Sequence, residues 1–300
     1  MTHRKTIFIS GATGRVGRQL VARLRGKHKL RLVARTASTL DAMAGPEIAT
    51  FVANLSDGAA ISRAMDGADI AVTMIPSNHS ADDFAADQRE KMQGQLEGLK
   101  NAGIAQVINL SSVGAHVTEG NGILGVLGEM ERALDALLGT RVVHLRPSYF
   151  FENAFYWNDL IRHQGITGLP TRDDVALPMI ATRDVARRLA ELLDAPTLPK
   201  ERVLPLLGAR DYTLPELTRA LAEAIELPSL RYVNVPAEQM KAGLTATGGS
   251  ESFAEKYVEL AEAFSTGLLN QEARTAESTT ETGLEEFARE VFAPAFRAAG

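Results

Sequence analysis

The sequence contains no cysteine among its 300 residues, and this absence excludes several kinds of chemistry. A chain without cysteine has no disulfide, no thiol nucleophile and no cysteine-ligated zinc. Six histidines remain as possible metal ligands, but their spacings match no paired-ligand motif, so we expect no metal site. These histidines are His3, His28, His79, His116, His144 and His163.

The sequence also lacks a strong charge of one sign and any long hydrophobic run. The net charge is -5 with no local cluster of lysine and arginine, so we expect no nucleic-acid partner. The apolar stretches at residues 71–76 and 104–110 are far shorter than the roughly 20 residues that a membrane span needs. Residues 7–10 are too short for a secretory signal. We therefore expect no membrane association and a cytoplasmic location.

The first half of the chain alternates short β-branched runs with longer amphipathic stretches. This alternation is typical of a parallel sheet that is covered by helices on both faces. We therefore predict an α/β fold with a Rossmann-type doubly wound parallel sheet. The expected strands are residues 6–10, 30–34, 49–53, 70–75, 106–110 and 142–145, and the expected helices are residues 18–25, 81–102 and one that begins near Glu129.

The regular alternation ends near residue 150, where an aromatic cluster begins. We interpret residues 1–150 as a Rossmann domain and residues 151–300 as a smaller, discontinuous α/β substrate or lid domain. Residues 175–195 are expected to return to the first domain, because residues 183–193 form an amphipathic helix. Asp184, near the start of that helix, is interpreted as structural.

Two helix starts are expected in the second half. Thr213 and Glu216 have the spacing of a capping box, and Thr282 and Glu285 repeat it. The polar segments 243–252 and 272–282 are expected to be mobile loops. The acidic helix 252–264 has an apolar face that suits a core, a lid or a partner surface.

Three glycines follow the first expected strand directly. Gly11 permits a tight turn, Gly14 lets a pyrophosphate approach the backbone, and Gly17 lets the next helix pack closely on the strand. The amides at the start of that helix favour an anion. An ordinary strand-to-helix turn is the alternative, but the flanking elements favour a dinucleotide. The predicted phosphate loop is Gly11, Ala12, Thr13, Gly14, Arg15, Val16 and Gly17.

The end of the second expected strand distinguishes NAD(H) from NADP(H). An acidic residue there binds the ribose hydroxyls, whereas an arginine accommodates the 2′-phosphate. This chain has Arg35 at that position and no acid before Asp41. We therefore favour NADP(H) over NAD(H); the alternative is that Arg35 is a solvated surface cation.

Several segments together resemble the NmrA-like family of atypical short-chain dehydrogenases/reductases. The similarity covers about residues 5–235, and its most specific part after the glycine loop is the arginine-proline-aromatic-asparagine stretch from Arg146 to Asn153. The family binds NAD(P) and includes quinone reductases, other reductases and proteins that only sense the cofactor. The similar segments are residues 11–17, 33–35, 107–115, 145–153 and 180–186.

The resemblance implies positions for the cofactor and its acceptor. Implied cofactor contacts are Asn54 and Leu55 at the adenine, Met74, Ile75 and Pro76 along the adenosine, Ser111 and Ser112 at the nicotinamide, and Pro147, Ser148, Tyr149 and Phe150 over it. An apolar pocket for a flat ring is expected nearby, although core packing of its aromatic residues is an equal alternative. The predicted substrate contacts are Val113, Phe151, Asn153, Tyr156 and Trp157.

The catalytic pair of typical short-chain dehydrogenases is missing. That pair is a tyrosine with a lysine four residues later, and none of the eight lysines fits; Leu127 and Glu131 stand at the aligned positions. Alcohol dehydrogenation and epimerisation, which need this proton relay, are therefore disfavoured. Hydride transfer to a quinone requires mainly positioning. Ser112 and His116 are candidate polar helpers, and the catalytic residue is otherwise unknown.

Two classes of function follow from these observations. The first is an NAD(P)H-dependent oxidoreductase that passes hydride to a small apolar acceptor such as a quinone; a reductase of another carbonyl or imine is a variant of it. The second is a non-catalytic NAD(P)(H) sensor that acts through a regulatory protein partner. The missing catalytic pair favours the sensor, and the predicted pocket favours the enzyme. A homo-oligomer is compatible with both.

Overall fold

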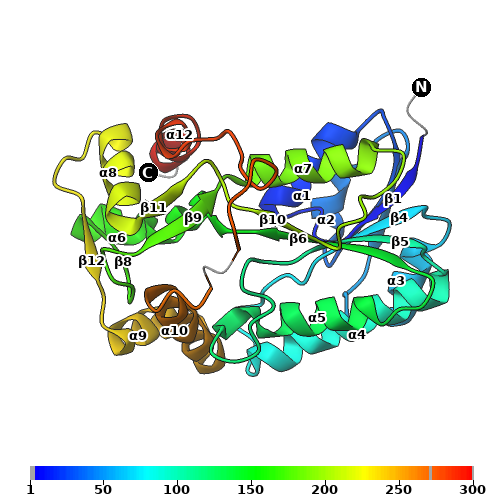
Figure 1. Ribbon diagram of the computed structural model, residues 1–300, viewed down its shortest axis with the longest axis horizontal. Coiled ribbons are helices and arrows are strands. Elements are labelled where there is room, and N and C mark those ends of the chain that lie inside the picture. Colours follow the sequence, from blue (N-terminus) through cyan, green and yellow to red (C-terminus); the bar gives the residue numbers. More distant parts are fainter. Residues whose placement is uncertain (1–3, 270–271, 299–300) are drawn as a thin grey trace.

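A seven-stranded parallel sheet forms the centre of the computed structural model, which describes residues 4–269 and 272–298. The strand order is β10-β6-β5-β4-β1-β2-β3, and the prediction of a Rossmann-type sheet is confirmed (Figure 1). The order reverses between β1 and β4, which is where ligands bind in such sheets. The strands are β1 (Thr6–Ile9), β2 (Lys29–Ala34), β3 (Ile48–Val52), β4 (Ile70–Thr73), β5 (Gln106–Leu110), β6 (Arg141–Pro147) and β10 (Val203–Leu206).

Helices cover both faces of this sheet (Figure 1). Ile7 and Ile9 of β1 pack into the core on one face, and Phe8 packs into the core on the other, because successive side chains of a strand alternate. On one face lie α1 (Arg15–Leu24), α2 (Ala37–Asp41) and α7 (Thr182–Asp194), and on the other lie α3 (Gly58–Met65), α4 (Phe84–Ala102) and α5 (Gly125–Asp135). The short η1 (Gly122–Leu124) precedes α5. None of the helices within the described ranges is long and apolar enough to cross a membrane.

Several element boundaries differ from the sequence-based expectation. Helix α1 begins at Arg15 rather than residue 18, because Gly14 already has the extended backbone of an N-cap. Helix α4 begins at Phe84, where the Asp83 carboxylate accepts a hydrogen bond from the Ala86 amide. Helix α5 begins at residue 125 rather than 129. Strand β6 continues to Pro147, which has no amide to donate but pairs with Leu206 of β10.

A second, separate core lies beside the C-terminal edge of the sheet. It is built around a three-stranded sheet of order β11-β9-β7 and a parallel pair, β8 and β12. We interpret the two cores as belonging to two domains. The elements of the second region are β7 (Tyr149–Phe150), η2 (Phe151–Trp157), α6 (Asn158–Gln164), β8 (Ile166–Leu169), β9 (Ala176–Ile180), β11 (Asp211–Thr213), α8 (Leu214–Ile225), β12 (Arg231–Asn234), α9 (Ala237–Ala246), α10 (Glu251–Ser265), α11 (Leu284–Phe287), η3 (Ala288–Phe292) and α12 (Ala293–Ala298).

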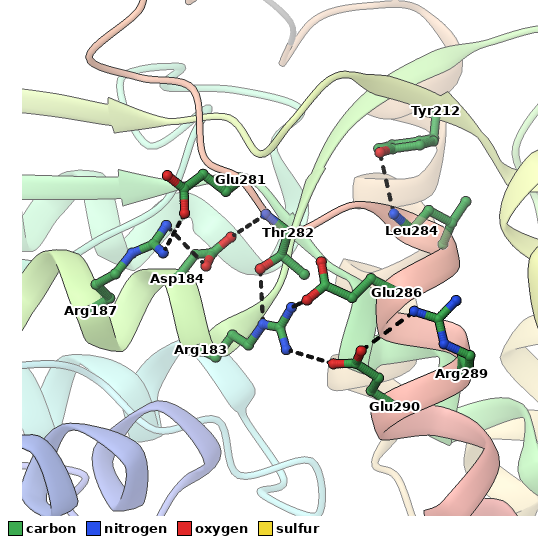
Figure 2. A network of polar contacts seen from close by, with 10 residues as sticks. All are labelled: Arg183, Asp184, Arg187, Tyr212, Glu281, Thr282, Leu284, Glu286, Arg289 and Glu290. Carbon is green, nitrogen blue, oxygen red and sulfur yellow. Dashed lines mark hydrogen bonds and ion pairs between the residues drawn. The ribbon is translucent and has the colours of Figure 1, made fainter.

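Polar contacts fasten the C-terminal helices to α7 (Figure 2). The Arg183 guanidinium donates to the Thr282 hydroxyl at 2.9 Å and pairs with Glu286 and Glu290. The carboxylate of Asp184, which is buried, accepts a hydrogen bond from the Thr282 amide at 3.2 Å. Asp184 is thus a structural residue that joins two distant segments.

These contacts correct the expected start of α11. The capping box of Thr213 and Glu216 is present at α8. The second capping box is wrong: α11 has Gly283 as its N-cap, and glycine has no side chain to cap the helix. Thr282 lies one residue earlier, and its hydroxyl accepts a hydrogen bond from Arg183 instead. The expected loops are also more ordered than predicted. Residues 243–246 belong to α9, and the segment 272–282 contains the buried side chains of Ser278, Thr280 and Thr282.

Candidate functional site

The glycine loop adopts a conformation that requires glycine at two positions. Gly11 has φ +70°, and a Cβ there would lie 2.5 Å from the Met74 sulfur. A Cβ on Gly17 would lie 2.1 Å from the Gly11 carbonyl oxygen, which belongs to the backbone and has little freedom to move. The loop therefore brings the start of α1 as close to the end of β1 as the backbone allows.

The start of α1 offers donors to an anion. The first helical hydrogen bond runs from the Arg18 amide to the Gly14 carbonyl at 2.9 Å, and no side chain caps the helix. The amides of residues 15–17 therefore have no partner within the helix, and the helix dipole adds positive potential at this end. This arrangement is suited to a phosphate group.

A cleft of about 500 Å³ extends from this loop along the carboxyl ends of β1, β4, β5 and β6. Most predicted site residues lie in its wall, although they come from four separate segments of the chain. They are Gly11, Gly14, Arg15, Val16 and Gly17, then Met74, Ile75 and Pro76, then Ser111, Ser112 and Val113, then Pro147, Ser148, Tyr149, Phe150, Asn153 and Tyr156.

Other predicted contacts lie outside the wall of this cleft. Arg35 is exposed at the end of β2, and Ala12 is buried behind the glycine loop. Phe151 and Trp157 are buried in the second core, where Phe151 contacts the Tyr212 and Phe287 rings. For these two residues the structure therefore shows core packing, which was the alternative to substrate contact. Also outside are Thr13, Asn54, Leu55 and His116.

Arg15 links the glycine loop to the second core. Its guanidinium lies 5.0 Å from the centre of the Phe155 ring and 5.9 Å from that of Tyr156, and it donates to the Glu152 carbonyl at 3.3 Å. These cation–π contacts place the arginine at the mouth of the cleft, where Tyr156 is 61% exposed. A cation here adds to the positive potential of the helix start.

Three serines, Ser111, Ser112 and Ser148, line the cleft where the resemblance places the nicotinamide. The Ser111 and Ser148 hydroxyls are buried, and within the described residues neither has a hydrogen-bond partner. A buried hydroxyl is normally paired, so each of these two can receive a polar ligand group such as a carboxamide. The Ser112 hydroxyl, in contrast, donates to the Val113 carbonyl at 2.9 Å and is engaged locally.

A buried ion cluster lies directly behind the Pro147–Ser148 segment. Arg146 makes two hydrogen bonds to Glu131 of α5, one of them at 2.9 Å, and a third to Glu272 at 2.8 Å. Burial raises the pKa of Glu131, but the hydrogen bonds and the charge of Arg146 outweigh it, so the pKa is lowered overall. His116 lies 3.4 Å from Arg146. Glu131 therefore anchors this end of the cleft, and His116 belongs to the anchor.

Helix α10 supplies an aromatic wall on the side of the second core, which we define as Phe253, Tyr257, Leu260 and Phe264. All four line the cleft. The Phe264 ring meets the Tyr149 ring edge-on at 5.7 Å. The apolar face of this helix therefore forms part of the cleft wall, a role that differs from the three considered for it.

Asn153 is half-buried near this wall, and its partner is the Tyr149 hydroxyl. Burial raises the pKa of Tyr149 well above the usual value for tyrosine, and it also raises the pKa of Tyr257. Both phenols therefore keep their protons at neutral pH.

The sequence reasoning assigned no site role to His79. This residue follows β4, lines the cleft, and stacks on the Phe253 ring with centroids 4.1 Å apart and planes 10° apart. Its location after a parallel strand, at the edge where ligands bind, was the available signal.

Comparisons with known proteins agree with this geometry. A family model described as NAD(P)H-binding matches residues 11–196. The NAD(P)H azoreductase of Xenophilus azovorans is 24% identical over 255 residues, which is 85% of each chain. A nucleoside-diphosphate-sugar epimerase structure from Staphylococcus aureus has a TM-score of 0.78 at 18% identity and covers 95% of this chain and 100% of its own.

A further similar structure is that of an Escherichia coli NADPH-dependent quinone oxidoreductase complexed with NADPH. Its TM-score is 0.72 at 19% identity, with 95% of this chain and 99% of that chain covered. At such identities the structures show a shared fold. Together with the family match, they confirm the resemblance on which the predicted cofactor class rests.

Proposed function

Because the chain belongs to the NAD(P)H-binding family, we propose that it is an NADPH-dependent reductase of a flat aromatic acceptor, a quinone in the first instance. The observation that carries this proposal is one continuous cleft, which joins the glycine loop at one end to the aromatic wall at the other. Concave, largely apolar clefts of this size are typical of small-molecule sites. In this proposal the cofactor lies against the glycine loop and the flat acceptor against the aromatic wall.

The geometry of the cleft supports some of the proposed cofactor contacts. The amides of residues 15–17 and the Arg15 guanidinium would hold the pyrophosphate, and the Ser148 hydroxyl would receive the carboxamide. Arg35, outside the cleft wall just after β2, would bind the 2′-phosphate of NADPH. When bound, the cofactor supplies a hydride from its nicotinamide ring.

The aromatic wall favours a flat apolar acceptor. Quinones and azo compounds both have this shape, and the names of two similar proteins, an azoreductase and a quinone oxidoreductase, refer to such acceptors. Reduction of either needs close approach to the hydride donor more than a dedicated Tyr-Lys relay. The absence of that relay is therefore compatible with an enzyme.

Turnover tests the proposal directly. Purified protein is mixed with NADPH and with menadione, a quinone, or methyl red, an azo compound, and the loss of reduced-nicotinamide absorbance is followed. We expect acceptor-dependent oxidation with at least one of the two. Binding of NADPH without turnover of any acceptor contradicts the enzyme and fits a cofactor sensor.

Arg35 tests the cofactor preference. We expect Arg35→Ala to weaken NADPH binding roughly tenfold, the effect of losing about 1.4 kcal/mol, and to leave NADH binding unchanged. Lys29→Ala is the matched control, because Lys29 is an exposed cation at the opposite end of the same strand. Equal losses for both cofactors would show that Arg35 does not contact the 2′-phosphate.

A further inference from the structure

His79 lines the cleft beside the aromatic wall. Its imidazole stacks on Phe253 of that wall, and its ring centroid is 6.2 Å from that of Tyr156. Phe253 belongs to α10 and Tyr156 to η2, whereas His79 comes from the loop after β4. A molecule seated in the cleft against the Phe253 end of the wall therefore lies beside this imidazole.

The loop that carries His79 is held at several points. The Ser250 amide donates to the His79 carbonyl at 2.8 Å, which fixes the loop to the start of α10. On the α4 side, Lys91 donates to the Pro76 carbonyl and pairs with Asp87, which in turn accepts a hydrogen bond from Asn78. The imidazole is thus positioned by a rigid support.

The described lining of the cleft contains no carboxylate, lysine or thiol. Its titratable side chains are Arg15, His79, Tyr149, Tyr156 and Tyr257. Arginine stays charged at all accessible pH values, and burial raises the pKa of Tyr149 and Tyr257 further above neutrality. Among these described lining residues, His79 is therefore the one suited to donate a proton near neutral pH.

We propose that His79 is the proton donor to the acceptor, and this inference rests on the proposed reductase function. For an azo substrate, one nitrogen accepts the hydride and the other takes the proton from the His79 imidazolium. The N=N bond becomes an HN–NH bond, NADPH becomes NADP⁺, and the imidazole regains a proton from water. A quinone needs this proton less, because its reduced oxygens are protonated by solvent.

The pH dependence has a defined direction. Burial lowers the pKa of His79 from its usual value of 6.5, and the ring neighbours that face it, Phe253 and Tyr156, carry no charge that opposes this. The charged groups on the surrounding elements are Arg15, which lies beyond Tyr156, and Asp87 on the α4 side, which pairs with Lys91. The imidazolium fraction therefore rises as the pH falls below neutrality, and azo reduction rises with it.

The test compares His79→Phe and His79→Gln with the wild type. Phenylalanine keeps a ring against Phe253 but has no proton to give, so it separates packing from proton transfer. We expect both variants to reduce methyl red about a hundredfold more slowly, to lose the rise in rate at acidic pH, and to reduce menadione only a few-fold more slowly. The matched control is His163→Gln, which should behave as wild type, because His163 is an exposed residue of α6.

A second measurement uses the wild-type protein alone and does not depend on turnover. In wild-type protein with NADP⁺, the side-chain NMR signal assigned to His79 should titrate below the usual histidine pKa and should shift when methyl red is added. A signal unmoved by saturating dye contradicts the contact. His79→Phe with wild-type azo turnover contradicts proton donation and leaves the reductase standing, whereas wild-type protein that reduces neither acceptor contradicts the proposed function itself.

Discussion

The two ends of the cleft are built in different ways. The glycine loop is made of consecutive residues, and its shape is fixed by backbone contacts such as that between Gly17 and the Gly11 carbonyl. The aromatic end is assembled from side chains far apart in sequence, such as His79 and Phe253. A fold can thus keep one cofactor and change its acceptor, because the second end is altered by side chains alone.

Arg146 anchors the segment Pro147–Ser148 of the cleft through Glu131 and Glu272, and its replacement should have the largest effect. Arg146→Met leaves the buried Glu131 carboxylate without its partner, which typically costs about 3–5 kcal/mol of folding stability. Chemical denaturation measures this loss. The control Arg202→Met removes an exposed pair with Asp135 and should cost no more than about 1 kcal/mol. Equal losses for the two variants would show that the cluster is not an anchor.

Gly17→Ala should damage the cofactor end selectively. The new Cβ would lie 2.1 Å from a backbone oxygen, so the loop must shift, at a cost of about 1–3 kcal/mol. We expect NADPH binding to weaken roughly ten- to hundredfold, measured by calorimetry. The control is Gly243→Ala in α9, where an added Cβ meets no other atom within 4 Å, and it should leave binding unchanged. Unchanged binding by Gly17→Ala would refute the close-packed loop.

Phe253→Ala should damage the acceptor end selectively. It removes the ring that supports His79 and part of the aromatic wall, so we expect the KM for menadione to rise several-fold. NADPH affinity should stay within about twofold of wild type, since Phe253 lies outside the glycine loop. If Phe253→Ala weakened NADPH binding as much as it raised the KM for menadione, the two ends of the cleft would not be independent.

Acidification gives the smallest predicted effect. Burial lowers the pKa of His79 and of His144 below 6.5, so the folded state binds fewer protons than the unfolded state. Stability is therefore retained above pH 6.5 and is lost as the pH falls below it. We expect the melting temperature to fall between about pH 7.5 and pH 5.5, and to fall less in His79→Phe. An equal fall in both would assign the effect to other groups.

The sequence predicted those features whose causes are local. The strand-to-helix loop at residues 11–17 and the alternation of strands and helices depend on neighbouring residues, and both are present. Features with distant causes were missed. Thr282 and Glu285 have capping-box spacing, but the helix has Gly283 as its N-cap, and the Thr282 hydroxyl instead accepts from Arg183, 99 residues away. The role of His79 emerges only once α10 is packed beside the loop after β4.

Isothermal titration of the wild-type protein with NADPH tests the central claim, that the amides of residues 15–17 form an anion site at the edge of the sheet. We predict saturable binding of one NADPH per chain, which becomes weaker as salt is raised. No binding of NADPH or NADH at millimolar concentration would contradict the cofactor site, and with it the reductase and the role proposed for His79.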